Sequence, residues 1–139
     1  MKVIIAGSRN ISWYPLVESI IKKSGFKITE VVSGAARGVD TQGEIWAQSN
    51  NIPTKVFKVT SDDWKTIGKS AGFRRNGKMA AYADGLIAIW DGESNGTRNM
   101  IEQMQKLHKP VHVVKVDLDE MYVPHGYKRH GVDEDESVT

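Results

Sequence analysis

The stretch "VVSGAARGVDTQGEIWAQ", residues 31–48, decides the fold class of this chain. It starts as a short apolar run, passes through a turn of glycines and alanines, and continues into residues that suit a helix. The turn carries almost no side chains before Arg37. Glycine allows a close approach to the backbone, and a helix N-terminus offers free N–H groups to an anion. We therefore interpret this stretch as a strand-to-helix junction against which a ligand can lie.

The same alternation of apolar runs and helical stretches continues along the chain. Strands are expected at 2–7, 28–34, 54–59, 85–92 and 111–116, and helices from Ser12, at 38–50, 70–83 and 95–107. Ser12 is expected to cap the first helix, whose apolar face would carry Trp13, Leu16, Val17, Ile20 and Ile21. The stretch that begins with "SDDW" at residue 61 is expected to be less regular. Alternating strands and helices predict an α/β fold: a Rossmann-like open, mostly parallel five-stranded sheet with helices on both faces.

The 139 residues fit one domain. Residues 117–139 hold seven acidic and two basic side chains, a net charge of −5, and the other 116 residues carry +7. We expect a ligand-binding domain over 1–116 and an acidic, partly disordered C-terminal tail over 117–139. The basic body favours anionic ligands such as phosphates, although a solvated lysine-rich surface would give the same charge.

Several classes of function find no support in the sequence. There is no cysteine, so disulfides and thiolate chemistry are excluded, which suits a reducing, cytoplasmic setting. No apolar run approaches the length of a membrane span. The histidines lack metal-ligand spacing, and no turn matches GxGxxG or the P-loop, so we expect neither a metal nor a cofactor.

Glycine-bearing turns follow three of the expected strands. They are "AGSRN" (6–10), "SGAARGVD" (33–40) and "DGESNGTRN" (91–99). Ligands of open α/β sheets bind at the carboxyl ends of the strands, so we expect the three turns to meet at one phosphate-binding site. The candidate ligand-binding residues in these turns are Gly7, Ser8, Arg9, Ser33, Gly34, Ala35, Arg37, Gly38, Asp40, Asp91, Gly92, Ser94, Gly96 and Thr97.

A fourth stretch, "SAGFRRNGKMA" (70–80), is glycine-bearing and basic and then enters a helix. Its Arg74, Arg75 and Asn76 are also candidate ligand-binding residues. Exposed helix charges and residues that close over an anion both fit this pattern. Trp46 and Trp90 are expected in the core, whereas Trp13 and Trp64 are candidates for stacking on a base.

The four stretches together resemble the SLOG superfamily, a Rossmann-like group that includes the LOG nucleotide phosphoribohydrolases and the DprA proteins. The segments that carry the resemblance are "IIAGSR", "VVSGAARGVDTQGEIWA", "AGFRRNGKMA" and "ADGLIAIWDGESNGTRNMI". The sequence looks most similar to the YspA branch, which is related to YpsA. The resemblance implies a site for a nucleotide or a nucleotide-derived small molecule, and a homo-oligomer.

The resemblance to LOG enzymes, which cleave the N-glycosidic bond of nucleotides, extends to one of two functional positions. "RNGKM" places Arg75 at the position of the arginine that assists cleavage. The position of the LOG glutamate is occupied by Met100, and Glu102 should face elsewhere because it lies about 200° around the helix. The candidate catalytic residues are therefore Arg75, with Asp40 or Asp91 as the carboxylate.

The missing glutamate favours binding over cleavage. We therefore expect the chain to sense or sequester a nucleotide-derived ligand, and the resemblance suggests phage–host conflict or stress signalling as the setting. One alternative is an enzyme, a nucleotide phosphoribohydrolase or N-glycosidase. The second alternative is binding of single-stranded nucleic acid, as the resemblance to DprA proteins would imply.

Overall fold

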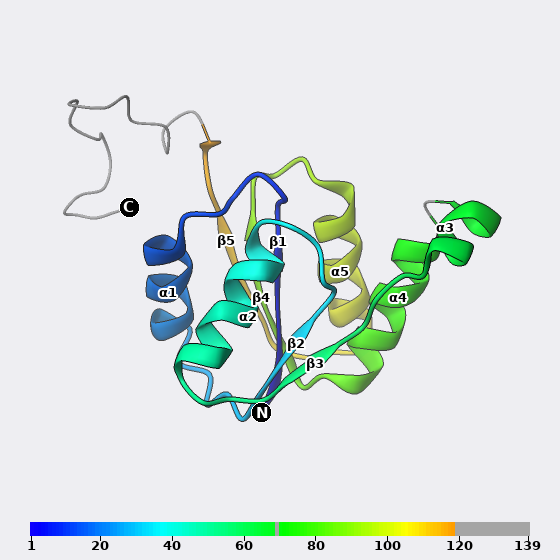
Figure 1. Cartoon of the computed structure of the whole chain (residues 1–139). Coiled ribbons are helices and arrows are strands. Elements are labelled where there is room, and N and C mark those ends of the chain that lie inside the picture. Colours follow the sequence, from blue (N-terminus) through cyan, green and yellow to red (C-terminus); the bar gives the residue numbers. More distant parts are fainter. Residues whose placement is uncertain (69, 119–139) are drawn as a thin grey trace.

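Five parallel strands lie side by side between two layers of helices in the computed structural model of this chain (Figure 1). The structure describes residues 1–68 and 70–118, so the expected tail lies, from residue 119 on, outside the described residues. The strands are β1 (Lys2–Gly7), β2 (Glu30–Ser33), β3 (Thr54–Val56), β4 (Gly85–Trp90) and β5 (Val111–Lys115). The helices are α1 (Tyr14–Lys23), α2 (Val39–Ser49), α3 (Ser61–Ile67), α4 (Ser70–Tyr82) and α5 (Asn95–Lys106).

The order of the strands across the sheet is β3-β2-β1-β4-β5, and every neighbouring pair is parallel. The chain therefore builds outward in one direction from β1 to β3 and then in the other from β4 to β5. Such a reversal opens a crevice at the carboxyl ends of the two central strands, which is where ligands of this fold class bind. The expected Rossmann-like α/β fold is confirmed.

Alternate residues of the strands supply two separate apolar layers. Val3 and Ile5 of β1 pack in a cluster with residues of α1 and α2, whereas Ile4 and Ala6 pack in a cluster with residues of α4 and α5. The two helix pairs therefore cover opposite faces of the sheet, as Figure 1 shows. Strands that are covered on both faces must be apolar on both, which explains the continuous apolar run of β4.

Two expectations about local structure are wrong. Ser12 does not cap α1: the helix begins at Tyr14, the N-cap residue Trp13 makes no side-chain cap, and Trp13 is 40% exposed. Pro15 lies in the first helical turn, where no N–H is needed, and this favours the later start. The stretch from Ser61 is a regular helix, α3, whose N-cap Thr60 accepts a hydrogen bond from the Asp63 N–H at 3.0 Å.

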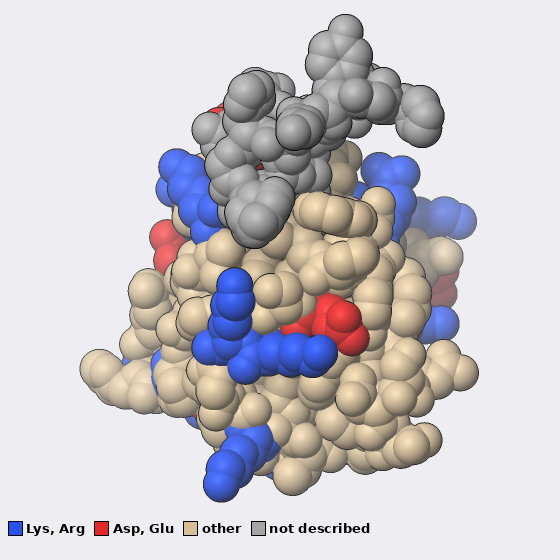
Figure 2. All heavy atoms as spheres, turned by 90° about the vertical axis from the view of Figure 1, so that its left-hand side faces the viewer, with Lys and Arg blue, Asp and Glu red and all other residues tan. Residues whose placement is uncertain are grey.

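Charge is spread thinly over the side of the molecule where α1 lies. Figure 2 shows separate Lys and Arg side chains there on a largely uncharged surface, with Asp and Glu side chains among them. The described part of this face therefore carries no continuous basic band. Among the described residues, no helix is long and apolar enough to cross a membrane.

Candidate ligand-binding cleft

A small cleft of about 70 Å³ opens at the carboxyl ends of β1 and β2, beside the N-terminus of α5. It is lined by Ala6, Gly7, Arg9, Gly34, Ala36, Asp40, Arg75, Asn76, Met79, Ser94, Gly96, Thr97 and Met100. These residues come from the end of β1, from the turns after β1 and β2, from the start of α2, from α4, and from the N-cap and first turns of α5. The structure thus brings Gly7, Gly34 and Gly96 together with Arg75, while their role in binding a ligand stays a prediction.

The turn after β2 packs directly on the turn after β1 because two glycines leave room for it. Gly38 has a φ of 77°, and a Cβ atom there would lie 2.4 Å from the carbonyl oxygen of Ser8. A Cβ atom on Gly7 would lie 2.0 Å from the carbonyl oxygen of Ile89 in β4. Neither contact is physically possible, so both positions require glycine. At these two positions glycine makes room for neighbouring backbone rather than for a ligand.

The second turn is held by side chains at both of its ends. Ser33 Oγ accepts a hydrogen bond from the Ala35 N–H at 3.1 Å and donates one to Glu44 Oε2 at 2.5 Å. Ala35, which is exposed, has a φ of 60°. That conformation is costly for alanine and is found mainly where the surrounding structure enforces it, as at functional sites.

Five polar or charged side chains are buried in the described part of the chain, and all five lie at this edge of the sheet: Ser8, Ser33, Asp40, Asn76 and Thr97. Burying a polar group costs free energy unless the group is hydrogen-bonded. The buried polar side chains are gathered around the cleft, whereas the two apolar clusters form the core of the described structure. Such a concentration of polar groups is typical of a binding or catalytic site.

Arg75 reaches from α4 across the cleft. Its Nη1 atom donates a hydrogen bond to the carbonyl oxygen of Gly34 at 2.6 Å, and its Nε atom donates one to Asn76 Oδ1 at 3.3 Å. Asn76 in turn donates to the carbonyl oxygen of Gly96 at 3.2 Å and to Asn99 Oδ1 at 3.1 Å. These bonds tie the guanidinium to the turn after β2 on one side and to α5 on the other. The cleft therefore contains a positioned positive charge.

Asp40 lies beside this arginine at the start of α2. Burial raises the pKa of Asp40 to about 6, against the opposing effects of the Ala36 N–H, which donates to Oδ2 at 3.3 Å, and of the Arg75 charge. Burial lowers the pKa of Arg75, and Asp40 opposes that shift. An arginine stays protonated in spite of such a shift. Arg75 and Arg9 place two positive charges at the cleft against the single carboxylate of Asp40, so the net charge of the lining favours an anion.

The N-terminus of α5 closes the other side of the cleft. Ser94 is its N-cap residue, and Ser94 Oγ accepts hydrogen bonds from the N–H of Thr97 at 3.5 Å and from Thr97 Oγ1 at 3.3 Å. The N–H groups of Asn95 and Gly96 have no acceptor within the helix at these first positions. Gly96 lines the cleft, and a Cβ atom there would meet nothing within 4 Å, so no neighbouring group fills the space beside this first turn.

Asp91 does not lie in the cleft. Its Oδ1 atom accepts hydrogen bonds from the N–H groups of Glu93 at 2.8 Å and Ser94 at 2.9 Å, and its own N–H donates to Ser8 Oγ at 3.0 Å. Partial burial disfavours the charged form of Asp91, but these N–H groups outweigh burial and lower its pKa. Asp91 therefore shapes the turn that leads into α5, with Ser8 bracing it.

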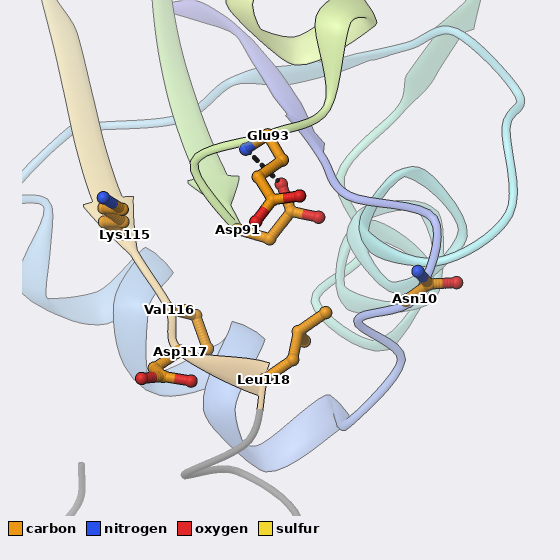
Figure 3. A pocket seen from close by; sticks show the side chains of 7 residues that line it. All are labelled: Asn10, Asp91, Glu93, Lys115, Val116, Asp117 and Leu118. Carbon is orange, nitrogen blue, oxygen red and sulfur yellow. Dashed lines mark hydrogen bonds between the residues drawn. The ribbon is translucent and has the colours of Figure 1, made fainter.

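The carboxylate of Asp91 faces a different and larger hollow of about 670 Å³ (Figure 3). Its lining residues are Asn10, Asp91, Glu93, Lys115, Val116, Asp117 and Leu118. Three of these are acidic, which disfavours a phosphate. Because of this acidic lining, we place the candidate site in the smaller cleft. Among the described residues, no group of histidines and carboxylates could hold a metal ion.

Three other predicted residues lie away from the cleft. Arg37 is exposed and does not line the cleft, and Arg74 faces another hollow with Phe57 and Lys78. Gly92 has a φ of 86° and lies against Lys115, so its role is in the turn after β4. Arg75 also borders the hollow that Arg74 faces, but of the two neighbouring arginines of α4 only Arg75 lines the cleft.

Residues that sequence reasoning had not assigned to the site also contribute. Met79 and Met100, both 1% exposed, line the cleft from α4 and α5. Glu44 supports the turn after β2 through Ser33. Its position one helical turn after Asp40 is the signal that could have indicated it. Glu102 is exposed and does not line the cleft, as expected.

The strand order and the cleft at its switch point define a Rossmann-like α/β domain. Among solved structures, this chain is similar to DNA processing protein A (DprA) from Streptococcus pneumoniae, with a TM-score of 0.65 and 19% sequence identity. The match covers 93% of this chain and 62% of that chain. At this identity the likeness shows the fold alone. No family model matches the chain, and no curated protein matches it.

Proposed function

We propose that this chain binds a nucleotide or a nucleotide-derived small molecule, and that the phosphate group of this ligand lies in the cleft beside Arg75. Binding serves to sense or sequester the ligand rather than to consume it. This proposal has four narrower parts: membership of the YspA-related branch, a homo-oligomeric state, a cytoplasmic location, and a role in phage–host conflict or stress signalling. They rest on the resemblance in sequence.

The observation that carries the proposal is the placement of Arg75. A half-buried guanidinium is fixed by the Gly34 carbonyl oxygen and by Asn76, and it faces the open N-terminus of α5 across the cleft. A planar guanidinium and helix N–H groups are the donors that proteins use most for phosphate. A rigid pair of this kind pays little entropy on binding, because both groups are already in place.

The size of the cleft supports a phosphate rather than a whole ligand in this position. Its volume of about 70 Å³ is far below the roughly 300 Å³ of a small ligand pocket. A single phosphate group is compact and takes several hydrogen bonds, which fits a small polar space. The rest of the ligand must then extend out of the cleft.

The residues that line the cleft support binding of the ligand rather than cleavage of its N-glycosidic bond. Cleavage of an N-glycosidic bond passes through an oxocarbenium-like state that a nearby carboxylate stabilises. Met100 occupies the position of the LOG glutamate, and Met79 lies with it on the floor of the cleft. A thioether neither carries charge nor takes a proton from water.

One observation favours the enzyme as a second candidate function. Asp40 lines the cleft, is 5% exposed and has a pKa of about 6, which is the range of a general acid or base near neutral pH. In this case Asp40 would replace the missing glutamate in a phosphoribohydrolase. We rank this function second because Oδ2 of Asp40 already accepts a hydrogen bond from the Ala36 N–H.

Binding of single-stranded nucleic acid is the third candidate, and the similarity to a DNA processing protein favours it. The phosphate of a strand would use the same cleft. Proteins that bind single strands also track the backbone with a positively charged groove. The cleft of about 70 Å³ is a compact space for one phosphate rather than a long groove, so a single nucleotide is the better match.

The experiment is a thermal unfolding series with AMP, GMP, CMP, UMP, cyclic nucleotides, ADP-ribose and a short single-stranded DNA. At about 100 times the dissociation constant, a ligand stabilises the native state by about 2.7 kcal/mol, which raises the Tm by roughly 10 °C in a domain of this size. We expect such a rise with at least one mononucleotide or ADP-ribose. A transition that no compound in the series moves would refute the proposal.

Arg74 and Arg75 provide a matched pair of variants for the same series. Arg75→Met should weaken the binding of the responding ligand roughly 10- to 150-fold, because a hydrogen bond to a charged group contributes about 1.5–3 kcal/mol. Arg74→Met removes the same charge from the next residue, outside the cleft, and should leave the affinity within about twofold of the native value. Equal losses in both variants would mean that net charge alone attracts the ligand.

A further inference from the structure

A second hollow, of about 210 Å³, adjoins the cleft and is not explained by the binding of a phosphate. It is lined by Arg9, Gly34, Ala35, Ala36, Lys58, Val59, Trp64 and Arg75. Four of these residues, Arg9, Gly34, Ala36 and Arg75, also line the cleft, so the two spaces lie on either side of a shared wall. We call this second space the side hollow.

Helix α3 supplies the aromatic wall of the side hollow and contributes little else to the fold. None of its seven residues is buried, so α3 adds nothing to the apolar core. Its Trp64 is 43% exposed. The exposed part of the indole borders the side hollow and is available to a ligand with an aromatic ring.

The ring of Trp64 lies beside α4. A Cβ atom on Gly72 of α4 would lie 3.7 Å from Cη2 of Trp64, which is an ordinary contact distance. The start of α3 is fixed by the Thr60 cap, and the Gly68 N–H donates to the carbonyl oxygen of Trp64 at 3.0 Å. The indole thus rests against α4 on one side and borders the side hollow on the other.

We propose that the side hollow is a base-binding subsite in which the nucleobase of the ligand stacks on Trp64 while its phosphate lies beside Arg75. This inference rests on the proposed function and specifies the ligand class as a mononucleotide, rather than a sugar phosphate or a free phosphate. Stacking on an aromatic side chain tolerates every base because each base has a π-face. Lys58 and Arg9 border the same space and add positive charge near the ribose and phosphate.

The two spaces together suit a ligand with one phosphate and one base. The cleft alone is too small for more than a phosphate, and the side hollow contains the aromatic surface that a phosphate does not need. Among the described lining residues of the side hollow, all charged groups are cations. A neutral base next to an anionic phosphate fits this distribution.

The test is isothermal titration calorimetry with AMP, ribose 5-phosphate and inorganic phosphate on the native protein, Trp64→Ala and Trp64→Phe. We expect the native protein to bind AMP roughly 5- to 150-fold more tightly than ribose 5-phosphate, the range that one stacked base contributes. Trp64→Ala should lose this advantage and keep its affinity for ribose 5-phosphate. Trp64→Phe should retain most of the affinity for AMP because it retains a ring.

Two controls separate the subsite from general effects of aromatic removal. Trp13 matches Trp64 in type and in exposure, at 40%, and Phe73 of α4 is 41% exposed; neither residue lines the cleft or the side hollow. Trp13→Ala and Phe73→Ala should bind AMP like the native protein. Indole fluorescence offers a second readout, because AMP should quench the native signal and leave that of Trp64→Ala unchanged.

Failure of the subsite and failure of the proposed function give different results. Equal affinities of the native protein for AMP and ribose 5-phosphate, both weakened by Arg75→Met, would overturn the subsite and keep the phosphate site. No binding of any of the three compounds would overturn the subsite, and a thermal unfolding series in which no compound moves the transition would overturn the phosphate site as well. Tighter binding of a single-stranded oligonucleotide than of AMP, dependent on Trp64, would replace the mononucleotide with a strand.

Discussion

Asp40 affects both the chemistry of the cleft and the stability of the fold. Its carboxyl group is 5% exposed, accepts one hydrogen bond from the Ala36 N–H and lies beside the Arg75 guanidinium. Burial nevertheless outweighs both partners and raises its pKa from 3.8 to about 6. Near neutral pH the native state therefore holds a carboxylate that would be more stable in water.

We predict that Asp40→Asn flattens the dependence of stability on pH. Because the native pKa is raised, the contribution of Asp40 is complete below about pH 3.8 and is lost as the pH rises through about 6. The shift corresponds to about 3 kcal/mol of unfolding free energy. Urea unfolding at pH 4.5 and pH 7.5 should show about 2 kcal/mol of this loss in the native protein, because part of it has already occurred at pH 4.5, and a smaller change in Asp40→Asn. Asp62→Asn, on exposed α3, is the control, and parallel pH curves for the native protein and Asp40→Asn would contradict the prediction.

We also predict that the native protein releases little or no free base from AMP, GMP, CMP or UMP. By the resemblance to LOG enzymes, Met100 stands where those enzymes have a glutamate, and loss of one acid–base group typically lowers a rate by about 10²- to 10⁴-fold. Chromatography of the incubated nucleotides is the measurement. Rapid release that Asp40→Asn abolishes would promote the phosphoribohydrolase to the first candidate function.

The two arginines of α4 show how far sequence reasoning reaches at the scale of a residue. Both fitted an anion site, and periodicity could have separated them, since Arg75 precedes buried Met79 by four positions and Arg74 precedes exposed Lys78 by four. Periodicity could not have shown that Asp91 lies outside the cleft. Its carboxylate bonds to backbone N–H groups two and three residues later, and such local turns compete with ligand binding without a distinct sequence signal.

At the scale of elements, the glycines of the turns divide into those that the packing requires and those that leave space. We predict that Gly7→Ala destabilises the fold by about 1–3 kcal/mol, because the Cβ atom of the alanine would lie 2.0 Å from the Ile89 carbonyl oxygen. Gly96→Ala, in the first turn of α5 with nothing within 4 Å, should be neutral or stabilise by up to about 1 kcal/mol. Urea unfolding measures both, and equal effects of the two changes would show that the contact at Gly7 is relieved by movement of β4.

Helix α3 is the element that the sequence reasoning missed. Its apolar content is too low for a periodic signal, and it buries no residue. The cap was nevertheless readable, since Thr60 is followed three residues later by Asp63, with acidic residues in the first turn. The strands, by contrast, were predictable because covered parallel strands are apolar throughout.

At the scale of the whole molecule, the site follows from topology more than from any single motif. Three turns distant in sequence meet because parallel strands end at one edge of the sheet, and that rule needed only the element order. The sequence could not indicate how tightly the turns pack. The cleft is small because Gly7 and Gly38 bring backbone segments together, and this leaves the side hollow for the rest of a ligand.

The central claim, that a nucleotide phosphate lies beside Arg75, is tested most directly by phosphorus NMR of AMP during titration with the protein. The account predicts that the AMP phosphate resonance shifts or broadens with the native protein and with Arg74→Met, and that it stays unchanged with Arg75→Met of the same fold and stability. An AMP phosphate resonance that the native protein leaves unchanged, or that Arg75→Met perturbs as strongly as the native protein does, would contradict the claim.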